Sequence, residues 1–417
     1  MTKDGFFLLL ILFFLSPLSS QAATEWLVKS PTRACLDDLP LSSAPEDLGI
    51  GGWTLLRPTK EFSLEGLRSF CPALDGEPNS RFVPWRDRKI SSADPYLSQQ
   101  WGLEDIKALN VPEGPGVLVA VLDTGVDASH PDLQSALWKS PGETGRDAQG
   151  RSKETNGIDD DGNGFVDDVI GWDFVENDNQ PSDVLRWWNE GHGTHLAGII
   201  AAQADNDLGI RGVAPGSSVM ILRFIDTGGY GTTSAAIRSV RYAIRQGAKI
   251  LNISWGGDAA GVTASRALKD AFLEAERAGL LIVVAAGNGS VDLDQSPERS
   301  VPASYRLKNM IVVAASGPGG HRATFSNFGS KSVDLAAPGI GILSTVPGGG
   351  FERFDGSSVA VPHVVGALSR VWGASPHLKA DQLKKALLKS VTPTPVLEHR
   401  VITSGRVNVE SFWKEIF

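Results

Sequence analysis

Residues 117–125 read VLVAVLDTG: six apolar residues lead to a carboxylate and then to a Thr-Gly turn. An unbroken apolar run of this length is typical of a strand buried on both faces of a parallel sheet. Four similar runs follow, at 219–222 (VMIL), 250–253 (ILNI), 280–285 (LLIVVA) and 310–315 (MIVVAA). Helical patterns lie between or after them, at 233–246, 264–278 and 380–389. This alternation predicts an α/β fold built on a mainly parallel sheet.

Composition limits the classes of protein to consider. Of the 417 residues, 41% are hydrophobic, which excludes disorder over most of the chain. The net charge of -9 provides no electrostatic footprint for nucleic acid, so we expect no nucleic-acid partner. The chain has two cysteines, Cys35 and Cys71, which argues against a disulfide-stapled scaffold and a thiolate zinc site.

The chain begins with an apolar run, FFLLLILFFL, at residues 6–15. The run is too short for the roughly 18 apolar residues that span a bilayer, and no other segment is long enough, so we expect no stable membrane insertion. Small residues at 20, 22 and 23 match a cleavage site, which predicts a signal peptide over 1–23 and a secreted or periplasmic protein. The alternative is an uncleaved interfacial anchor. In an oxidising compartment Cys35 and Cys71 could pair.

Residues 24–93 differ from the rest of the chain in composition and in the pattern of predicted elements. Prolines are spread through them, strand-like pieces occur at 26–28 and 53–56, and a helical stretch occurs at 64–70. The charged run at 86–89 is suited to a linker or processing region. We expect a small α+β domain over 24–93, followed by one large domain over 94–417.

The first polar motif is Asp123, at the end of the run at 117–122. A carboxylate there is costly unless it is paired. Aspartic proteases carry Asp-Thr-Gly twice, and this chain has a second copy at Asp226. The α/β pattern argues against that all-β class, and Asp226 opens a glycine-rich loop.

The second motif is Gly-His-Gly-Thr-His at 191–195. His192 and His195 could form a metal pair on a helix, but a third ligand and the acidic base of a zinc site are missing from the pattern. His192, between glycines at a helix start, is better placed to act as a base. We interpret His195 as a buried structural residue.

Two further motifs place polar groups at strand ends and helix starts. Ser357 and Ser358 precede an apolar helix at 364–372, where the helix dipole stabilises negative charge, although either serine could simply be an N-cap. Pro362 falls near the first turn of that helix, where proline is tolerated. Asn288, in Gly-Asn-Gly after the run at 280–285, is either a turn residue or a donor to an oxyanion.

In order and spacing, the four motifs resemble the subtilisin-like serine proteases (subtilases), and in particular the thermitase branch, over residues 94–417. The resemblance implies a three-layer fold and a secreted endopeptidase that works through an acyl-enzyme. It assigns Asp123 to orient His192, His192 as general base and then acid, and Ser358 as nucleophile. Asn288 and the backbone N–H of Ser358 would form the oxyanion hole.

The chain departs from the family pattern at three small residues. Ser357 stands where threonine is usual, Val359 where methionine is usual, and Val361 where threonine or serine is usual. None of these is a triad member. The alternative function is a catalytically inactive homologue that binds calcium or peptide, but a binding protein has no need of the complete set of catalytic residues.

The resemblance also implies a substrate site and an inhibitor. An extended protein or peptide substrate would add as an antiparallel strand between two segments, which contribute Gly228 and Gly229 on one side and Ser254, Trp255 and Gly256 on the other. Residues 24–93 would be a propeptide that inhibits the enzyme intramolecularly and is removed by self-cleavage between about Phe82 and Asp94. We expect the mature enzyme to be a monomer.

Residues 156–168, NGIDDDGNGFVDD, predict a calcium site. Asp159, Asp161 and Asn163 alternate as in the first half of an EF-hand loop, but Ile170 replaces its final glutamate, so Asp168 or the preceding aspartate would have to close the loop. A solvated acidic loop is the alternative. The thermitase resemblance implies two further structural Ca²⁺ sites, one at Asp94, Asp132 and Asn206 and one at Asp173, Glu176 and Asp178.

Overall fold

The computed structural model describes residues 94–183, 191–257, 265–296 and 300–417, together with short pieces of the N-terminal segment at 26–29, 42, 46–47, 53–56, 67 and 75–78. The chain divides into two compact units, residues 1–89 and residues 90–417. The predicted signal peptide, Cys35 and Cys71 lie outside the described residues.

The N-terminal unit contains a small antiparallel sheet in the order β2-β3-β1-β4. The predicted strand pieces at 26–28 and 53–56 pair with each other, with Trp26 opposite Leu56. Of the predicted helix at 64–70 only Leu67 is described, and it is helical. The strands are β1 (Trp26–Lys29), β2 (Glu46–Asp47), β3 (Trp53–Leu56) and β4 (Asp75–Pro78). The division of the chain into signal, propeptide and peptidase domain stays a prediction.

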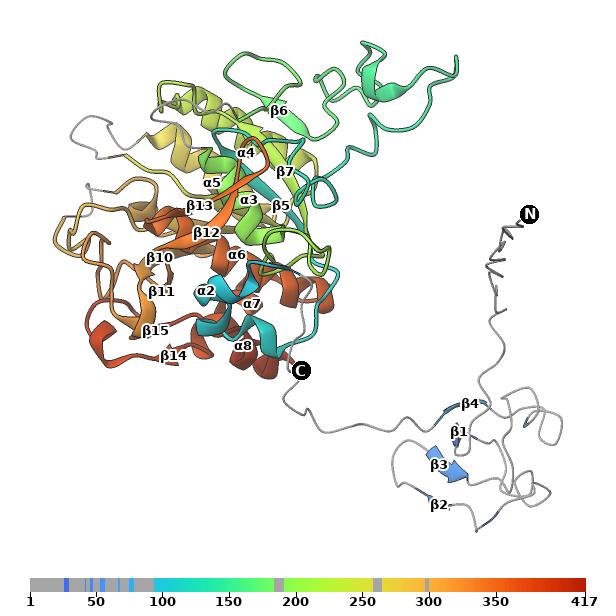
Figure 1. The fold of residues 1–417 in the computed structure, drawn as a ribbon, viewed down its shortest axis with the longest axis vertical. Helices are drawn as coiled ribbons and strands as arrows, with labels where there is room; N and C mark the ends of the chain where they lie inside the picture. Colours follow the sequence, from blue (N-terminus) through green and yellow to red (C-terminus); the bar gives the residue numbers. More distant parts are fainter. Residues whose placement is uncertain are drawn as a thin grey trace, which may run out of the picture. The chain divides into compact units, whose positions relative to one another are not determined.

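The C-terminal unit is built on a nine-stranded sheet in the order β14-β15-β11-β10-β9-β8-β5-β7-β6. All neighbours are parallel except β14 and β15. The five predicted strands are β7, β5, β8, β9 and β10, which are neighbours in the sheet. Figure 1 labels β7, β5 and β10 among them. The strands are β5 (Leu118–Asp123), β6 (Gly171–Asp173), β7 (Ser218–Arg223), β8 (Ile250–Ile253), β9 (Leu281–Ala285), β10 (Met310–Ser316), β11 (Leu335–Pro338), β14 (Thr392–Pro393) and β15 (Gly405–Arg406).

Helices cover both faces of this sheet, which confirms the predicted three-layer α/β fold. Alternate residues of β5 point into different cores: Val119 and Val121 pack with α3 (His192–Ala201) and α6 (Ser357–Ala374). Ala120 and Leu122 pack with α4 (Thr233–Arg245) and α5 (Arg266–Arg277) on the other face. The remaining elements are α2 (Trp101–Asp105), α7 (Ala380–Lys389), α8 (Val409–Ile416), the hairpin of β12 (Ile342–Val346) and β13 (Gly350–Phe354), and the 3-10 turns η2 (Leu97–Gln99), η3 (Ala108–Asn110), η4 (Lys153–Thr155), η6 (Ala303–Tyr305), η7 (Pro318–Gly320) and η8 (Pro395–Leu397).

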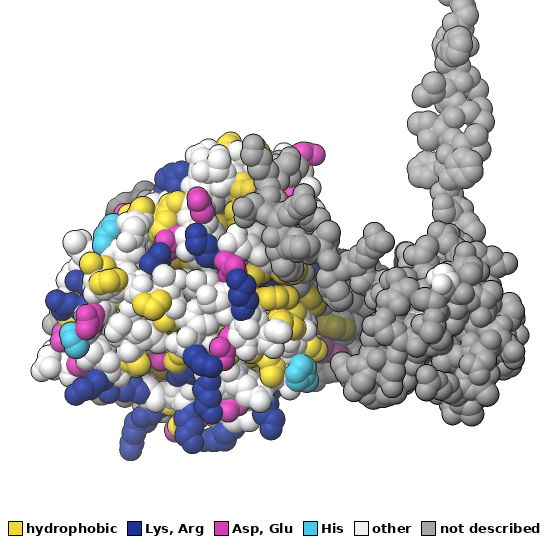
Figure 2. Space-filling view, turned by 90° about the horizontal axis from the view of Figure 1, so that it is seen from below, with side chains coloured by type: hydrophobic (Ala, Val, Ile, Leu, Met, Phe, Trp, Pro, Cys, Tyr) yellow, Lys and Arg dark blue, Asp and Glu magenta, His cyan; other side chains and the backbone are white. Residues whose placement is uncertain are grey.

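The exposed surface carries charges of both signs with scattered apolar side chains on the face seen in Figure 2. Within the described part of the chain, no helix is both long enough and apolar enough to cross a membrane. The features that matter for function are the carboxyl ends of β5 and β9 and the N-termini of α3 and α6, because the polar motifs of the sequence lie there.

Candidate active site

Strand β5 ends at Asp123 and helix α3 begins at His192, and their side chains meet. The imidazole Nδ1 lies 2.7 Å from Asp123 Oδ1, which also accepts the backbone N–H of Thr124 over 2.9 Å. Asp123 is buried. Because an ionised carboxylate can only accept hydrogen bonds, Nδ1 carries the proton and Nε2 is left as the proton-accepting nitrogen of His192.

Two glycines allow this approach. A Cβ on Gly193 would lie 2.1 Å from the carbonyl oxygen of Gly125, so the exit from β5 and the start of α3 touch backbone to backbone. The N–H of Gly193 donates to Thr124 Oγ1 over 2.9 Å. The glycines that follow Asp123 and His192 in the sequence therefore help to set the distance between the two side chains.

The electrostatic surroundings favour protonation of His192. Burial alone would lower the pKa of its imidazole, but the charge and hydrogen bond of Asp123, and then the charge of Asp183, raise that pKa above the ordinary value of 6.5. An imidazole of this kind is a stronger base than a free histidine.

Ser358 lies in the first turn of α6 and lines a cleft together with Asp123, Thr124 and His192. The cleft has a volume of about 670 Å³. Its other lining residues are Ile225, Gly229, Trp255, Arg353, Phe354, Asp355 and Val359. The first three follow β7 and β8 or lie in nearby loops, and residues 353–355 belong to the end of the β12–β13 hairpin and the turn before α6, which sequence analysis had not assigned to the site.

Pro362 lies in the second turn of α6, not near its first turn as the sequence suggested, because the helix already begins at Ser357. Proline has no N–H, so the carbonyl of Ser358, four residues earlier, lacks its usual partner within the helix. The hydroxyl of Ser254 donates to that carbonyl over 2.7 Å, and Asn252 Nδ2 donates in turn to the Ser254 hydroxyl over 3.0 Å. Residues of β8 and of the turn after it thus supply the hydrogen bond that Pro362 cannot give to this carbonyl.

Asn288 is held by the residue that precedes Ser358. Its Oδ1 accepts the backbone N–H of Ser357 over 2.9 Å and the Ser357 hydroxyl over 2.8 Å. A backbone N–H can only donate, so the atom facing it must be the amide oxygen, and the Asn288 Nδ2 donor faces elsewhere. Nδ2 and Ser358 Oγ lie 3.5 Å and 2.7 Å from the position that a Cβ on Gly356 would occupy. The missing side chain of Gly356 keeps the space between these two polar atoms open.

The two serines of the motif have different surroundings. The Ser357 hydroxyl donates to Asn288 and accepts the N–H of Gly287 over 3.0 Å, and Ser357 is buried. Neither serine caps α6 through its side chain. Ser358 is the one that lines the cleft.

His195 is not among the residues that line the cleft. Its Nε2 lies 3.0 Å from the carbonyl oxygen of Ile342 and 3.2 Å from that of Glu352, and its ring stacks on Phe354 with 4.0 Å between centroids. Burial lowers the pKa of His195 to about 3, so its ring is neutral. His195 therefore ties α3 to the β12–β13 hairpin, as expected for a structural residue and not for a metal ligand paired with His192.

The predicted substrate residues divide into two groups. Gly229 and Trp255 line the cleft, and Ser254 contacts Ser358. Gly228 and Gly256 are their sequence neighbours and are not among the lining residues.

The second Asp-Thr-Gly forms a turn: Asp226 Oδ1 accepts the backbone N–H groups of Gly228 and Tyr230 over 2.7 Å and 3.0 Å, with no link to Asp123.

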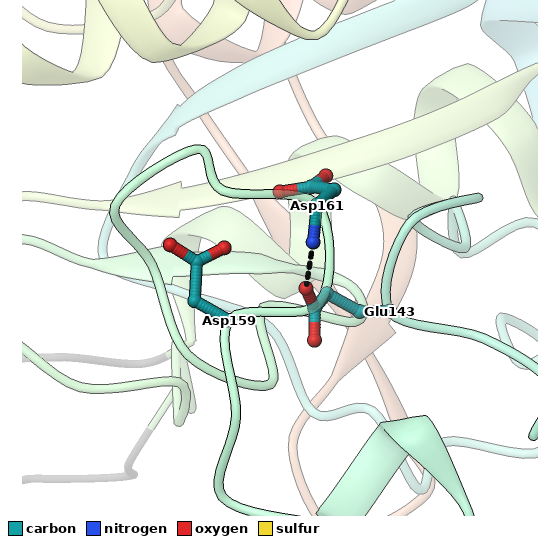
Figure 3. Close-up of side chains that lie close together, drawn as sticks. All are labelled: Glu143, Asp159 and Asp161. Carbon is teal, nitrogen blue, oxygen red and sulfur yellow. Dashed lines mark hydrogen bonds between the residues drawn. The ribbon is translucent and has the colours of Figure 1, made fainter. Parts of the chain in front are cut away.

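The acidic loop contains a cluster that includes a residue missed in the sequence. Among the described residues, Glu143, Asp159 and Asp161 place carboxylate oxygens within 4.8 Å of one another (Figure 3). Glu143 Oε1 accepts the N–H groups of Asp160 and Asp161 over 2.8 Å and 3.3 Å, while its buried Oε2 has no hydrogen-bond partner. Glu143 lies 16 residues before Asp159, outside any spacing pattern of the loop.

Two other predicted ligands of this loop, Asp168 and Asn163, contact each other. Asp168 is buried, its Oδ2 accepts hydrogen bonds from Tyr242 Oη at 2.5 Å and Asn163 Nδ2 at 2.9 Å, and its Oδ1 has no partner. Burial raises the pKa of Asp168 to about 6, and the charges of Asp161 and Glu143 add to the rise. Buried carboxylate oxygens without donors are the kind of group that a hard cation satisfies.

The residues of the second predicted calcium site also meet. Asn206 Nδ2 donates to Asp132 Oδ1 over 2.8 Å, and the Asn206 backbone N–H donates to Asp94 Oδ1 over 3.2 Å. Both aspartates are buried. Burial raises the pKa of Asp132, and the neighbouring charge of Asp94 contributes to this rise.

In the third predicted site, donors from the protein also contact the aspartates. Asp173 Oδ1 accepts the N–H groups of Val175 and Glu176 over 2.7 Å and 3.1 Å, and its Oδ2 pairs with Arg223. Asp178 Oδ1 accepts the N–H of Gln180 over 2.9 Å. Both oxygens of Asp173 are thus engaged by donors from the protein, as are both oxygens of Asp132 in the second site, by Asn206 and Ile210. A site at Asp173 and Asp178 stays a prediction.

Comparison with known proteins agrees with this geometry. The model of the "Subtilase family" matches residues 114–405. Thermitase of Thermoactinomyces vulgaris is 35% identical over 298 residues, 70% of this chain and 89% of that protein. An intracellular serine protease of Paenibacillus polymyxa is 35% identical over 273 residues, 65% of this chain and 72% of that protein. The crystal structure of a cold-adapted subtilisin-like serine proteinase matches with a TM-score of 0.56 and 29% identity, covering 74% of this chain and 97% of that one.

Proposed function

This chain belongs to the subtilase family and is a subtilisin-like serine endopeptidase, and from that premise we propose that Asp123, His192 and Ser358 cleave peptide bonds through an acyl-enzyme. The observation that carries the proposal is the 2.7 Å contact between His192 Nδ1 and Asp123 Oδ1 at the wall of the cleft that Ser358 also lines. This arrangement leaves His192 Nε2 as a base on the side of the cleft.

The reaction follows from these positions. His192 Nε2 takes the proton of Ser358 Oγ as that oxygen bonds to the substrate carbonyl carbon, and the carbonyl oxygen becomes an oxyanion. Asn288 Nδ2 and the backbone N–H of Ser358 donate to the oxyanion. His192 then gives its proton to the leaving amine as the C–N bond breaks, and water repeats the sequence on the acyl-enzyme. Asp123 stabilises the imidazolium in both halves.

The substrate is a protein or peptide bound in extended form. Gly229 and Trp255 line the cleft, and an extended chain can add main-chain hydrogen bonds between their segments, with Gly228 and Gly256 allowing close approach. The family's peptidase activity supports this substrate class.

We propose calcium as a structural cofactor at two sites. Glu143, Asp159 and Asp161 fit one ion, because they offer hard carboxylate oxygens within 4.8 Å of one another and the buried Glu143 Oε2 has no donor. Asp168 would be a further ligand, because its buried Oδ1 also has no donor and the charges of Asp161 and Glu143 act on it. Asp94, Asp132 and Asn206 would hold the other, a proposal that rests on the thermitase resemblance and on the proximity of both aspartates to Asn206. A bound ion would add stability by binding the folded state alone.

The remaining proposals rest on sequence. Residues 1–23 would direct export, and residues 24–93 would inhibit the cleft until the monomeric enzyme cleaves itself. Amino-terminal sequencing of active enzyme tests the processing step: we expect a start between about Phe82 and Asp94, and a start near Thr24 would contradict it.

A serine-directed fluorophosphonate probe tests the catalytic assignment. We expect the processed wild-type enzyme to be labelled and to cleave fluorescein-labelled casein, and Ser358→Ala to do neither. Ser357→Ala is the matched control, because it removes the adjacent hydroxyl but leaves the reacting one, and it should still be labelled. An unlabelled wild type would support the inactive homologue, and equal labelling of Ser358→Ala would overturn the nucleophile.

A further inference from the structure

Asp183 is a buried acid next to α3 that no step of the proposed reaction uses. Its Oδ2 accepts the backbone N–H of Thr194 over 3.1 Å and the Thr194 hydroxyl over 2.9 Å. Thr194 is the third residue of α3, and the residue before that helix, Gly191, has no side chain with which to cap it. Asp183 thus satisfies an N–H at the helix N-terminus from eleven residues upstream.

The backbone around Asp183 holds it against the end of β5. The segment before it pairs with Val126: the Val126 N–H donates to Pro181 over 3.0 Å, and the Asp183 N–H donates to Val126 over 3.0 Å. The Thr194 hydroxyl also accepts the N–H of Asp127 over 3.0 Å. The strand exit that carries Asp123 and the helix that carries His192 are therefore both joined to Asp183.

The position of His192 at the start of α3 disfavours the charged form of its imidazole. As the first residue of α3 it lies at the positive end of the helix dipole, which disfavours the imidazolium that the reaction forms. A carboxylate at the same helix end opposes that effect. The charge of Asp183 acts on His192 in the same direction as Asp123 and raises the pKa of the imidazole.

We propose that Asp183 is a positioning residue of the triad: it caps α3 at Thr194 and supplies a second negative charge that stabilises protonated His192. The inference rests on the proposed function, since it needs His192 to be the base. Burial raises the pKa of Asp183 itself, while the two Thr194 hydrogen bonds lower it and the charge of Asp123 raises it.

Other titratable and charged groups also lie near His192. Among the described residues, Asp123 contacts the imidazole directly, Arg353 and Asp355 line the same cleft from the hairpin side, and His195 on the next turn of α3 is neutral. Substitution at residue 183 removes none of these side chains.

The test is the pH dependence of fluorophosphonate labelling, which requires neutral His192. Asp183→Asn keeps an oxygen that can accept from Thr194 but removes the charge, so protonated His192 loses stability and its pKa falls. We expect the acidic limb of the labelling rate to move to lower pH by about half a unit, roughly a threefold change in the protonation equilibrium. The limiting rate at high pH should fall several-fold because the base is weaker.

Asp127→Asn is the matched control. Asp127 is a nearby acid after β5, but its carboxylate accepts from Ser129 and Gly348 instead of Thr194, so the limb should stay where it is in the wild type. Asp183→Ser, a second neutral capping residue, provides the same measurement if Asp183→Asn does not fold.

The outcomes separate the inference from the proposed function. The inference would be overturned if the acidic limb of the labelling rate moved by less than about 0.2 pH unit in Asp183→Asn or Asp183→Ser. Such a result would mean that Asp183 is uncharged or too remote to act on His192. A lower melting temperature without a moved limb would reduce Asp183 to a helix cap and overturn it as well. Labelling of Ser358→Ala would overturn the proposed function instead.

Discussion

The hydroxyl of Ser254 donates a hydrogen bond of 2.7 Å to the backbone carbonyl of Ser358. That carbonyl is available because Pro362, four residues further along α6, has no N–H to offer it. The turn after β8 is thereby fixed to the residue that carries the proposed nucleophile. A residue assigned to substrate binding from the sequence also supports the helix break next to the proposed nucleophile.

Ser254→Ala should therefore reduce both stability and activity. An unpaired buried carbonyl costs about 1–3 kcal/mol, and we expect kcat/KM to fall about tenfold because the Ser358 backbone shifts. Denaturant unfolding and casein hydrolysis measure the two effects. In the control, Ser239→Ala removes a similar buried hydroxyl-to-carbonyl bond in α4, so it should lower stability alone. Unchanged activity in Ser254→Ala would contradict the link.

Asn288→Asp should abolish most turnover with little change in substrate affinity. Aspartate keeps the oxygen that accepts from Ser357 but has no N–H for the oxyanion. We expect kcat to fall on the order of 10²–10³, a magnitude known for such a donor in subtilisin itself, with KM nearly unchanged. Steady-state kinetics on a peptide substrate check this. A rise in KM at constant kcat would instead assign Asn288 to ground-state binding.

The pH profile should have its acidic limb above pH 6.5. Asp123, assisted by Asp183, raises the pKa of His192 above that ordinary value despite burial, and only neutral His192 can act as base. kcat/KM should thus fall with one-proton dependence as the pH drops through the raised pKa. Because the folded-state pKa is the higher one, the stabilisation from protonated His192 is complete below pH 6.5 and is lost as the pH rises through the folded-state value. A limb at or below pH 6.5 would contradict this assignment.

Removing calcium should lower thermal stability. Ion binding at a hundred times Kd adds about 2.7 kcal/mol, so a chelator should lower Tm by roughly 5 °C and speed autolysis. Glu143→Gln should lose part of the difference in Tm between calcium and chelator, because it removes a buried ligand charge. Glu154→Gln alters an exposed acid of the same loop and is the control. Equal Tm values with calcium and chelator in the wild type would reject the sites.

Gly193→Ala should disrupt the active site through backbone contact. A Cβ there would lie 2.1 Å from the Gly125 carbonyl oxygen, so α3 must move away from β5 and His192 from Asp123. We expect a large loss of kcat, on the order of a hundredfold for a displacement near 1 Å. The control Gly247→Ala has a strained φ of 76° but meets no atom within 4 Å, so it should lower stability without loss of kcat.

Much of the architecture was predictable from local pattern. Apolar runs such as 117–122 have enough sequence signal to be recognised as buried strands, and α7 (Ala380–Lys389) occupies the predicted range. Asp123, His192, Asn288 and Ser358 each lie beside such an element, and their assignment to one site came from the resemblance of the four motifs to the subtilases. Pro362 was misplaced because a helix start depends on tertiary packing, and α6 begins seven residues before the apolar stretch that indicated it.

Other residues could not have been found this way. Glu143 and Asp183 have no periodicity or motif spacing that marks them, since their roles depend on chain segments brought together by folding. Residues 353–355 line the cleft because His195 holds the β12–β13 hairpin to α3.

The amino-acid sequence by itself determined the order of strands and helices and the polar residues at their ends, because hydrophobic period and turn chemistry are local. Only the tertiary structure decided which polar atoms meet: Asp123 with His192, Ser254 with Ser358, Asp183 with Thr194. Hydrogen-bond distance and burial depend on how parallel strands and the helices between them pack. Those relations join residues that lie 11, 69 and 104 positions apart, where no local pattern carries information.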